Sequence, residues 1–265
     1  MKKETCLSKH LMKIGLSGAL MICVSSNLYA ADSSDSERSV TVSGIIDTGL
    51  MSVNHVGDGT QSKLSAVDSI LGVSNVGFKG KEGLGNGLNA IYQLQAGFNP
   101  STGSLSSQGE LFSRNAYVGL ESSFGTLTVG KQWNFNDDWL VGSVFKGGYN
   151  SGAVFKFSEF DAVSEIYSRT IKYVTSNFGG LQGGLMYSAG GNAGNLSAGN
   201  IFNVALKYAQ GPYMLAASYD QEKDGAAVNN TGNLYKLTTI GGSYAFESAR
   251  VRLGYANSNI GGPGS

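Results

Sequence analysis

The chain has 265 residues, in which 19 basic and 19 acidic side chains balance, and it combines 39 Gly with only 3 Pro, 12 Phe and 13 Tyr. A balanced charge provides no strong electrostatic field for nucleic acid or anionic lipid. Disordered chains are usually rich in both glycine and proline, so this composition instead favours a folded sheet with many tight turns.

Residues 1–30 have the pattern of a bacterial secretory signal peptide. A basic stretch, "MKKETCLSKHLMK", precedes an apolar stretch, "IGLSGALMICVSS", and "LYA" provides a cleavage site near Ala30/Ala31. Both cysteines lie in this segment, so the exported chain, 31–265, is expected to lack disulfides and thiolate metal sites. Since the segment carries four Lys and one Glu, the exported chain would keep 15 basic and 18 acidic residues, with His55 as its single histidine. We expect no nucleic-acid partner and no cofactor.

After the signal peptide, apolar and polar residues alternate with the two-residue period of β-strands. In 88–98, for example, Leu88, Tyr92 and Leu94 fall on one face and Gln93 and Gln95 on the other. No segment shows the pattern of an amphipathic helix of ordinary length. We predict an all-β, antiparallel fold with about eleven strands, at residues 39–52, 70–82, 87–98, 110–121, 125–133, 167–176, 180–188, 200–209, 212–220, 233–246 and 249–257.

The connections between these strands alternate between short turns, such as "KEGLGNG", and long segments rich in Gly, Ser, Asn and Asp. A soluble sandwich has no need for this order, whereas outer-membrane barrels have short periplasmic turns and long external loops. After Ala31 no apolar run approaches the ~20 residues of a membrane helix. Aromatic residues near strand ends, including Tyr208, Tyr213 and Tyr244, are typical of interfacial girdles. The pattern predicts a transmembrane β-barrel with an apolar face toward lipid and a polar face toward a water-filled lumen.

The stretch 110–132, "ELFSRNAYVGLESSFGTLTVGKQ", predicts a strand, a tight turn and a second strand, with Arg114 inside the first. An arginine that faces lipid at mid-depth would cost about 2–4 kcal/mol. The alternation therefore predicts that Arg114 points into the lumen and that Tyr117 faces outward.

Four stretches of the sequence together resemble the Gram-negative general diffusion porins, especially the neisserial and Burkholderia type. These stretches are "VTVSGIIDTGL" (40–50), "SNVGFKGKEGLGNGLNAIYQLQAGF" (74–98), "LFSRNAYVGLESSFGTLTVGKQ" (111–132) and "SRTIKYVTSNFGGLQGGLMYS" (168–188). The resemblance implies a sixteen-stranded outer-membrane barrel, a homotrimer, and passive diffusion of small hydrophilic solutes and ions. It also implies that the third external loop folds into the lumen to form a constriction.

The long connection 134–166 stands in the place of that constriction loop. In the family, acidic groups on this loop face basic groups on the barrel wall, and the resulting field sets ion preference. The residue before "VGFKG" is Asn75, where an arginine is common, so the usual anion preference is not expected to follow. The candidate constriction residues are Asp137, Asp138, Glu159, Asp161 and Glu165 on the loop, and Arg114, Lys79, Lys172 and Asn75 on the wall.

The last residues, "NSNIGGPGS", read as a loop, whereas porins finish on a strand with a terminal Phe. Eleven strands cannot close a bacterial barrel, which has an even number of strands, and open edges are not tolerated in lipid. We therefore expect 31–265 to be an incomplete porin barrel domain, from a fragment or a truncated product.

Three alternatives to a channel remain open at this stage. A β-rich surface adhesin would use the long loops for binding. An outer-membrane hydrolase would need His55, or the carboxylate pair Asp137/Asp138, as part of a catalytic set. A truncated porin relative would have no channel function.

Overall fold

The protein is described by a computed structural model for residues 19–22, 38–56, 59, 61–70, 72–145, 163–191, 199–223 and 233–262. Thirteen strands form one antiparallel sheet, and a ten-residue π-helix, η1 (Asn136–Phe145), lies against one of its faces. The strands are β1 (Ala19–Ile22), β2 (Arg38–Val56), β3 (Gln61–Asp68), β4 (Asn75–Gly85), β5 (Leu88–Gly97), β6 (Asn115–Ser122), β7 (Gly125–Trp133), β8 (Ile166–Thr175), β9 (Leu181–Ser188), β10 (Ile201–Gln210), β11 (Tyr213–Lys223), β12 (Leu234–Ala245) and β13 (Arg250–Gly261).

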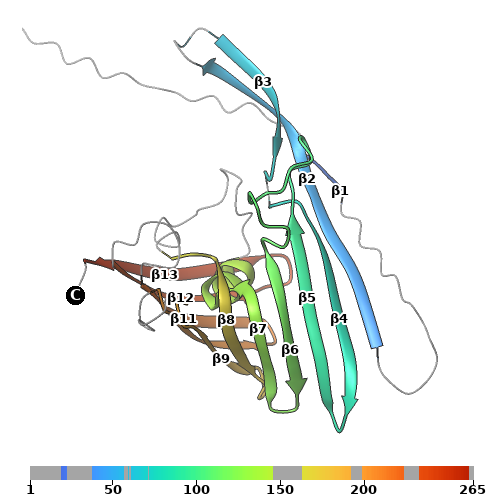
Figure 1. Cartoon of the computed structure of the whole chain (residues 1–265). Helices are drawn as coiled ribbons and strands as arrows, with labels where there is room; N and C mark the ends of the chain where they lie inside the picture. The colour runs from blue at the N-terminus through green and yellow to red at the C-terminus, as the bar shows by residue number, and fades with distance from the viewer. Residues whose placement is uncertain are drawn as a thin grey trace, which may run out of the picture.

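The sheet is a meander in which each strand from β4 to β12 pairs with the next strand along the chain, and β4 also pairs with β2. Figure 1 shows that this sheet curls around η1, which lies on its concave side. The pairing order runs from β1 to β13, and β3 pairs only with the C-terminal part of β2, from Thr48 to Val56. Among the described residues, the first and last strands of this order do not pair with each other.

All eleven predicted strands are confirmed, with shifts of a few residues at their ends. The prediction of a loop from residue 257 onward is wrong for 257–261, because β13 continues to Gly261 and pairs with β12 over this stretch. Two further strands were not predicted. The first, β3, forms a hairpin with the extension of β2, and its sequence, "QSKLSAVD", has too few apolar residues to show alternation. The second, β1, pairs with residues 46–49 of β2 and lies inside the predicted signal peptide, whose cleavage stays a prediction.

Short turns with glycine join the strands at one end of the sheet. Between β4 and β5, Asn86 and Gly87 have φ values of +51° and +75°. Two successive residues with positive φ are typical of the tight hairpin turns that match the right-handed twist of paired strands. The sequence places an Asn-Gly pair where this backbone needs it.

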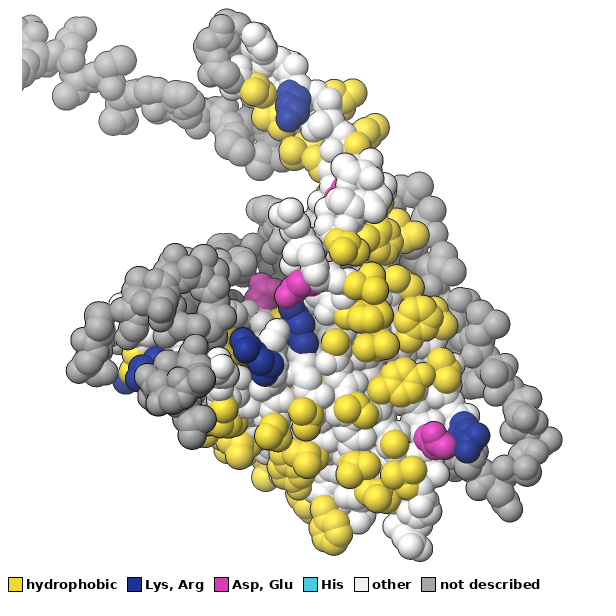
Figure 2. Space-filling model, in the orientation of Figure 1, with side chains coloured by type: hydrophobic (Ala, Val, Ile, Leu, Met, Phe, Trp, Pro, Cys, Tyr) yellow, Lys and Arg dark blue, Asp and Glu magenta, His cyan; other side chains and the backbone are white. Residues whose placement is uncertain are grey.

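The two faces of the sheet have opposite chemistry, as the alternation predicts. On β9 and β10 the exposed side chains are apolar, as in Leu185, Tyr187 and Leu206, whereas Met186 and Asn203 on the other face are fully buried. Figure 2 shows hydrophobic side chains spread over the face of β4–β9 turned to the viewer. A soluble sheet would bury such a face, so an exposed apolar face over many strands fits a barrel wall in lipid.

The predicted outward orientation of Tyr117 is wrong. β6 begins at Asn115, so the outward residues are Val118 and Leu120, which are 60% and 45% exposed. Tyr117 pairs across the strands with Gln93 and donates a hydrogen bond of 2.8 Å to its Oε1. It therefore lies on the polar inner face. The error came from predicting that the strand starts at residue 110. Arg114 was then taken as a strand residue that faces inward, and this assigned the wrong faces to the residues after it.

The helix η1 was not predicted, because its ten residues include three polar residues at the start and a glycine, with no long apolar stripe. Its start is capped by Asn134, whose Oδ1 accepts a hydrogen bond of 2.7 Å from the backbone N–H of Asp137. None of the helices in the described part of the chain is long and apolar enough to cross a membrane. The apolar cluster between η1 and the sheet includes residues of both. It consists of Phe135, Trp139, Leu140, Val144, Tyr167, Met186, Ile201, Ala205 and Ala216.

Phe135 is the anchor of this cluster, and a glycine makes room for it. A Cβ added at Gly184 would lie 2.3 Å from Cζ of Phe135, so the ring packs directly on the backbone of β9. The backbone N–H of Phe135 donates a hydrogen bond of 2.7 Å to Oδ1 of Asn203 on β10. Phe135 thus fixes the entry to η1 against two strands of the wall.

Gly184→Ala should therefore destabilise the folded protein by about 1–3 kcal/mol, the usual cost of overpacking a filled core. The measurement is urea unfolding of the chain in detergent micelles, followed by tryptophan fluorescence. Gly183→Ala is the matched control, because a Cβ there would make only ordinary contacts of 3.5 and 3.7 Å. Equal stability of the two variants would contradict this account of Phe135.

The connection between β5 and β6 is tied to the wall by an ion pair. Nζ of Lys131 on β7 donates a hydrogen bond of 2.6 Å to Oε2 of Glu110, and the Ser107 hydroxyl donates a weaker one of 3.3 Å. The hydrogen bond and charge of Lys131 hold the pKa of Glu110 below its usual range. Because this pKa is lowered on folding, the tie contributes fully above the unfolded pKa of about 4.3 and is lost as pH falls through the folded pKa.

We expect the backbone amides of 106–113 to lose protection from hydrogen exchange, relative to intrinsic rates, as pH falls through the folded pKa of Glu110. Glu110→Gln removes the titrating group and should show low protection at every pH. Protection that falls in the variant as steeply as in the wild type would assign the change to another group.

Candidate functional site

An ion pair ties η1 to the inner face of the sheet. Nζ of Lys172 on β8 lies 2.5 Å from Oδ2 of Asp138 on η1 and donates a second hydrogen bond of 2.7 Å to the carbonyl oxygen of Trp133. The same ammonium lies 4.5 Å from the centre of the Phe135 ring. The structure therefore joins Asp138 and Lys172, two of the predicted site residues, in one contact.

A row of amide side chains crosses the inner face from β4 to β6. Nε2 of Gln95 donates to Oδ1 of Asn75, and Nδ2 of Asn115 donates to Oε1 of Gln95, both at 2.8 Å. Asn75 is also held by a hydrogen bond of 2.8 Å from its Nδ2 to the carbonyl oxygen of Val73. The predicted site residue Asn75 is thus part of a neutral, fully oriented polar wall, and carries no charge.

Two lysines on β4 belong to the inner face, and they differ in their environment. Lys79 pairs across the strands with Thr41 and Gln93, is exposed, and makes no ion pair within the described residues. Lys81, two residues further on, forms an ion pair with Glu121 of β6. This ion pair was not predicted, although the strand period places Lys81 on the same face as Lys79.

Arg114 lies just before β6. Its backbone N–H donates a hydrogen bond of 3.2 Å to the carbonyl oxygen of Gln95, and its Cζ lies 4.8 Å from the centre of the Trp133 ring. The guanidinium therefore stacks on the ring of Trp133 at the end of β7. The carbonyl oxygen of the same residue accepts the hydrogen bond from Lys172. Stacking of this kind restrains an arginine and leaves its charge intact.

The predicted acidic residues are distributed over different positions. Asp137 is only 4% exposed and lies close enough to Asp220 of β11 for their charges to interact. Glu165 precedes β8, and its carbonyl oxygen accepts a hydrogen bond of 3.0 Å from the N–H of Asn134. Glu159 and Asp161 lie outside the described residues. Among these residues, the structure places Asp138 against a basic residue of the wall, Lys172.

A second tie between the connection 134–166 and the wall was missed. Glu222 on β11 accepts hydrogen bonds from the N–H of Ser164 at 3.0 Å, from its hydroxyl at 3.2 Å, and from the Tyr167 hydroxyl at 3.2 Å. Asp220 is fully buried and accepts a hydrogen bond of 3.1 Å from the Ser218 hydroxyl. The alternation of Ser218, Asp220 and Glu222 along one strand is the signal that could have located this tie.

The candidate catalytic residues lie on different elements, His55 on β2 and the Asp137/Asp138 pair on η1. The described residues contain no group of three or more His, Cys, Asp or Glu side chains suited to a metal ion. His55 lies near the end of β2, beyond the part of that strand that pairs with β4. Asp138 is engaged with Lys172, so the Asp137/Asp138 pair does not form an isolated carboxylate dyad.

Comparison with known proteins shows the family. The model of the Gram-negative porin family matches residues 18–264. An outer membrane porin protein of Bordetella pertussis is 32% identical over 264 residues, which cover 87% of this chain and 67% of the relative. The major outer membrane protein P.IB of Neisseria gonorrhoeae is 33% identical over 175 residues, or 64% of this chain and 48% of the relative. The chain therefore spans between about half and two thirds of these relatives.

Solved structures agree with the sequence comparison. The anion-selective porin from Comamonas acidovorans superposes with a TM-score of 0.73 at 26% identity, over 84% of this chain and 69% of that one. Salmonella typhi OmpF, at 18% identity and a TM-score of 0.60, shares the fold. With its apolar outer face and polar inner face, the chain belongs to the Gram-negative porin family and is an outer-membrane porin.

Proposed function

We propose that this porin conducts small hydrophilic solutes and ions through a water-filled lumen that η1 narrows. The single observation that carries this proposal is the contact between Lys172 and Asp138, which holds η1 against the polar face of a sheet whose other face is apolar. A helix fixed in this way reduces the open cross-section next to charged side chains. Selectivity in pores arises from such constrictions.

The proposed constriction combines residues of the connection 134–166 with residues of the wall. On the wall, Lys79 and Arg114 contribute positive charge, and Asn75 contributes an oriented amide. On the connection, five acidic residues contribute negative charge: Asp137, Asp138, Glu159, Asp161 and Glu165. Lys172 belongs to the wall, beneath η1. A field between the two sides would orient polar solutes as they pass.

We infer weak ion selectivity for this chain. The Comamonas acidovorans structure is described as an anion-selective porin. Here Lys172 and Lys81 are each paired with a carboxylate, and a neutral amide occupies position 75. Because two lysines are paired and position 75 is neutral, the wall carries fewer uncompensated positive charges than a wall with unpaired lysines and an arginine at position 75 would carry. We therefore infer a smaller preference for anions than such a wall would give.

We also propose a homotrimer as the functional assembly, on the basis of family membership. A solved structure of Vibrio cholerae OmpT, which shares the fold at 15% identity, is described as a trimer form. Cross-linking of the chain in outer-membrane vesicles tests this proposal, with a band at three times the protomer mass as the expected result and a monomer alone as the contradicting one.

The direct test of conduction is the current through planar bilayers to which the purified full chain is added. Stepwise, ohmic increases in current are expected, and deletion of 134–166 should raise the conductance of each step. A chain that inserts into the bilayer without any current would contradict the proposed function.

Asp138→Asn should shift the reversal potential in a KCl gradient toward anions, because the positive charge of Lys172 loses its counter-charge. Lys172→Gln should shift it in the opposite direction. The double variant removes both charges and should return close to the wild-type value. Identical reversal potentials for all four proteins would show that this pair does not face the conduction path.

Lys79→Gln should shift the reversal potential toward cations, because Lys79 is exposed on the inner face and makes no ion pair within the described residues. Lys63→Gln is the matched control, since that lysine is exposed on the β2–β3 hairpin. An equal shift in both variants would indicate a general charge effect instead of a position in the lumen.

A further inference from the structure

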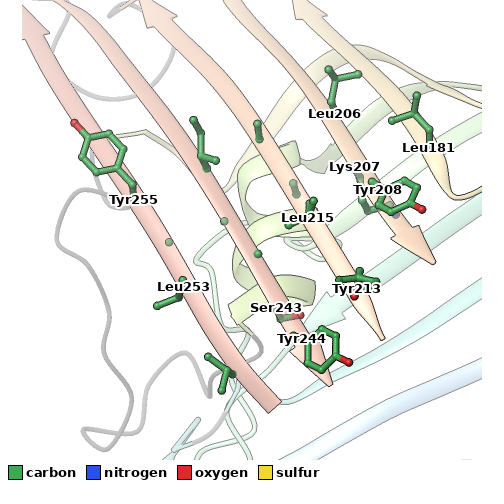
Figure 3. Close-up of a pocket in the computed structure, with 17 residues that line it drawn as sticks. Leu181, Leu206, Lys207, Tyr208, Tyr213, Leu215, Ser243, Tyr244, Leu253 and Tyr255 are labelled. Atoms are coloured by element: carbon green, nitrogen blue, oxygen red, sulfur yellow. The ribbon is translucent and has the colours of Figure 1, made fainter. Parts of the chain in front are cut away.

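A groove of about 720 Å³ lies on the apolar outer face of the last four strands, β10–β13. Figure 3 shows its lining, with leucine side chains along the strands, Tyr208, Tyr213 and Tyr244 near one end, and Tyr255 away from them. Its volume falls in the range of about 300–1,000 Å³ that is usual for small-molecule sites. The groove is therefore a local feature of the outer face that is large enough to hold a ligand.

The register of the strands explains why a groove forms here. One cross-strand row on the outer face runs Leu206, Ala217, Ile240 and Tyr255, and the next runs Tyr208, Leu215, Gly242 and Leu253. Ala217 and Gly242 are the small members of these rows and lie diagonally across the paired strands β11 and β12. Large neighbours on both sides of two small residues leave a trough.

One wall of the trough partly overhangs its floor. A Cβ added at Gly242 would lie 2.6 Å from Cδ2 of Leu215, so the leucine reaches over the glycine. Leu215, Ile240 and Leu253 are all more than half exposed, and nothing in the described chain covers them. The trough is thus preformed, walled by aliphatic side chains and open toward the surroundings of the barrel.

The aromatic end of the groove lies at the short turns. Tyr213 is the first residue of β11, and Tyr244 is the last but one of β12. Their ring centres are 5.0 Å apart in an edge-to-face arrangement. Tyr244 makes a similar contact of 4.7 Å with Phe246. Short turns are periplasmic in outer-membrane barrels, and aromatic rings at strand ends lie at the level of lipid headgroups.

We propose that this groove binds one acyl chain of a phospholipid from the periplasmic leaflet, with the hydroxyls of Tyr213 and Tyr244 at the boundary between chain and headgroup. The groove is continuous with the face that an outer-membrane porin turns to lipid, and this tyrosine pair lies at the end where a headgroup would lie, whereas Tyr255 lines the groove away from that end. The proposal depends on outer-membrane location and is independent of conduction.

A flexible hydrocarbon chain suits this shape better than a second copy of the protein does. The outer face of a copy would present the same pleated rows of side chains, which would span the trough without filling it. Interiors and specific interfaces are packed without such voids. An acyl chain can follow the irregular wall, and each buried methylene contributes about 0.8 kcal/mol.

The test is native mass spectrometry of the full chain in detergent micelles supplied with dioleoylphosphatidylethanolamine or, separately, lipid A. Ala217→Phe fills the trough. Ala116→Phe is the matched control. Ala116 lies two residues before the outward residue Val118 on β6, so it faces the same side of the sheet, and it lies outside the groove. We expect one phosphatidylethanolamine retained per wild-type chain and per control chain. Ala217→Phe should retain it about tenfold less, as the loss of two buried methylenes would produce.

A second variant protects the test against misfolding of the first. Leu215→Ala removes one wall of the groove instead of filling it, and it should lower phosphatidylethanolamine retention as well. Equal retention by the wild type and both groove variants would overturn the proposal, as would no retention at all. Retention of lipid A in preference to phosphatidylethanolamine would also overturn it, as would a two-chain complex that Ala217→Phe alone disrupts.

Discussion

The whole structure depends on the requirement that backbone polar groups be paired where no water is present. In hydrocarbon an unpaired N–H or C=O is costly, so strands that cross a membrane must bond to neighbours along their length. The meander from β4 to β13 satisfies this requirement with antiparallel pairing along each strand, interrupted by register shifts only near Gly83/Gly85 and Gly130/Gln132 in the described residues. Once the backbone is paired in this way, the two-residue period sends alternate side chains to opposite faces. The chemistry of each face then follows from which residues occupy odd and even positions.

The apolar packing that a soluble protein would place between layers is here concentrated around η1. Phe135 packs on Gly184 of the wall, Asn203 holds its backbone, and Lys172 pairs with Asp138. Glu222 secures the other end of the same connection through Ser164. The described ends of this connection are therefore both held against the wall, as a selective constriction requires. The structural and functional roles of these residues are therefore linked.

Much of the fold could be predicted from the sequence, because strand period and turn composition are local signals. The outer and inner faces of β4, β10, β11 and β13 follow directly from alternation. Tyr117 was misplaced because an irregular segment ends at Arg114, and a strand's starting residue decides the face of every later one. The helix η1 is stabilised by tertiary contacts with β11 and β12, and Phe135 at its entry packs on β9, which no local pattern records. The groove at Gly242 depends on which residues face each other across four strands, and a single sequence does not give that register.

The most direct test of the central claim is the labelling of single cysteines along β6 with a membrane-impermeant thiol reagent, in a chain whose Cys6 and Cys23 are replaced. Cysteine at position 117 or 121 should react, because these positions lie on the inner face of β6, are partly exposed and face a water-filled lumen. Cysteine at position 116, 118 or 120 should be protected, because these positions face lipid. Reversed labelling, or equal labelling of both sets, would contradict the account of a porin wall with a polar inner face.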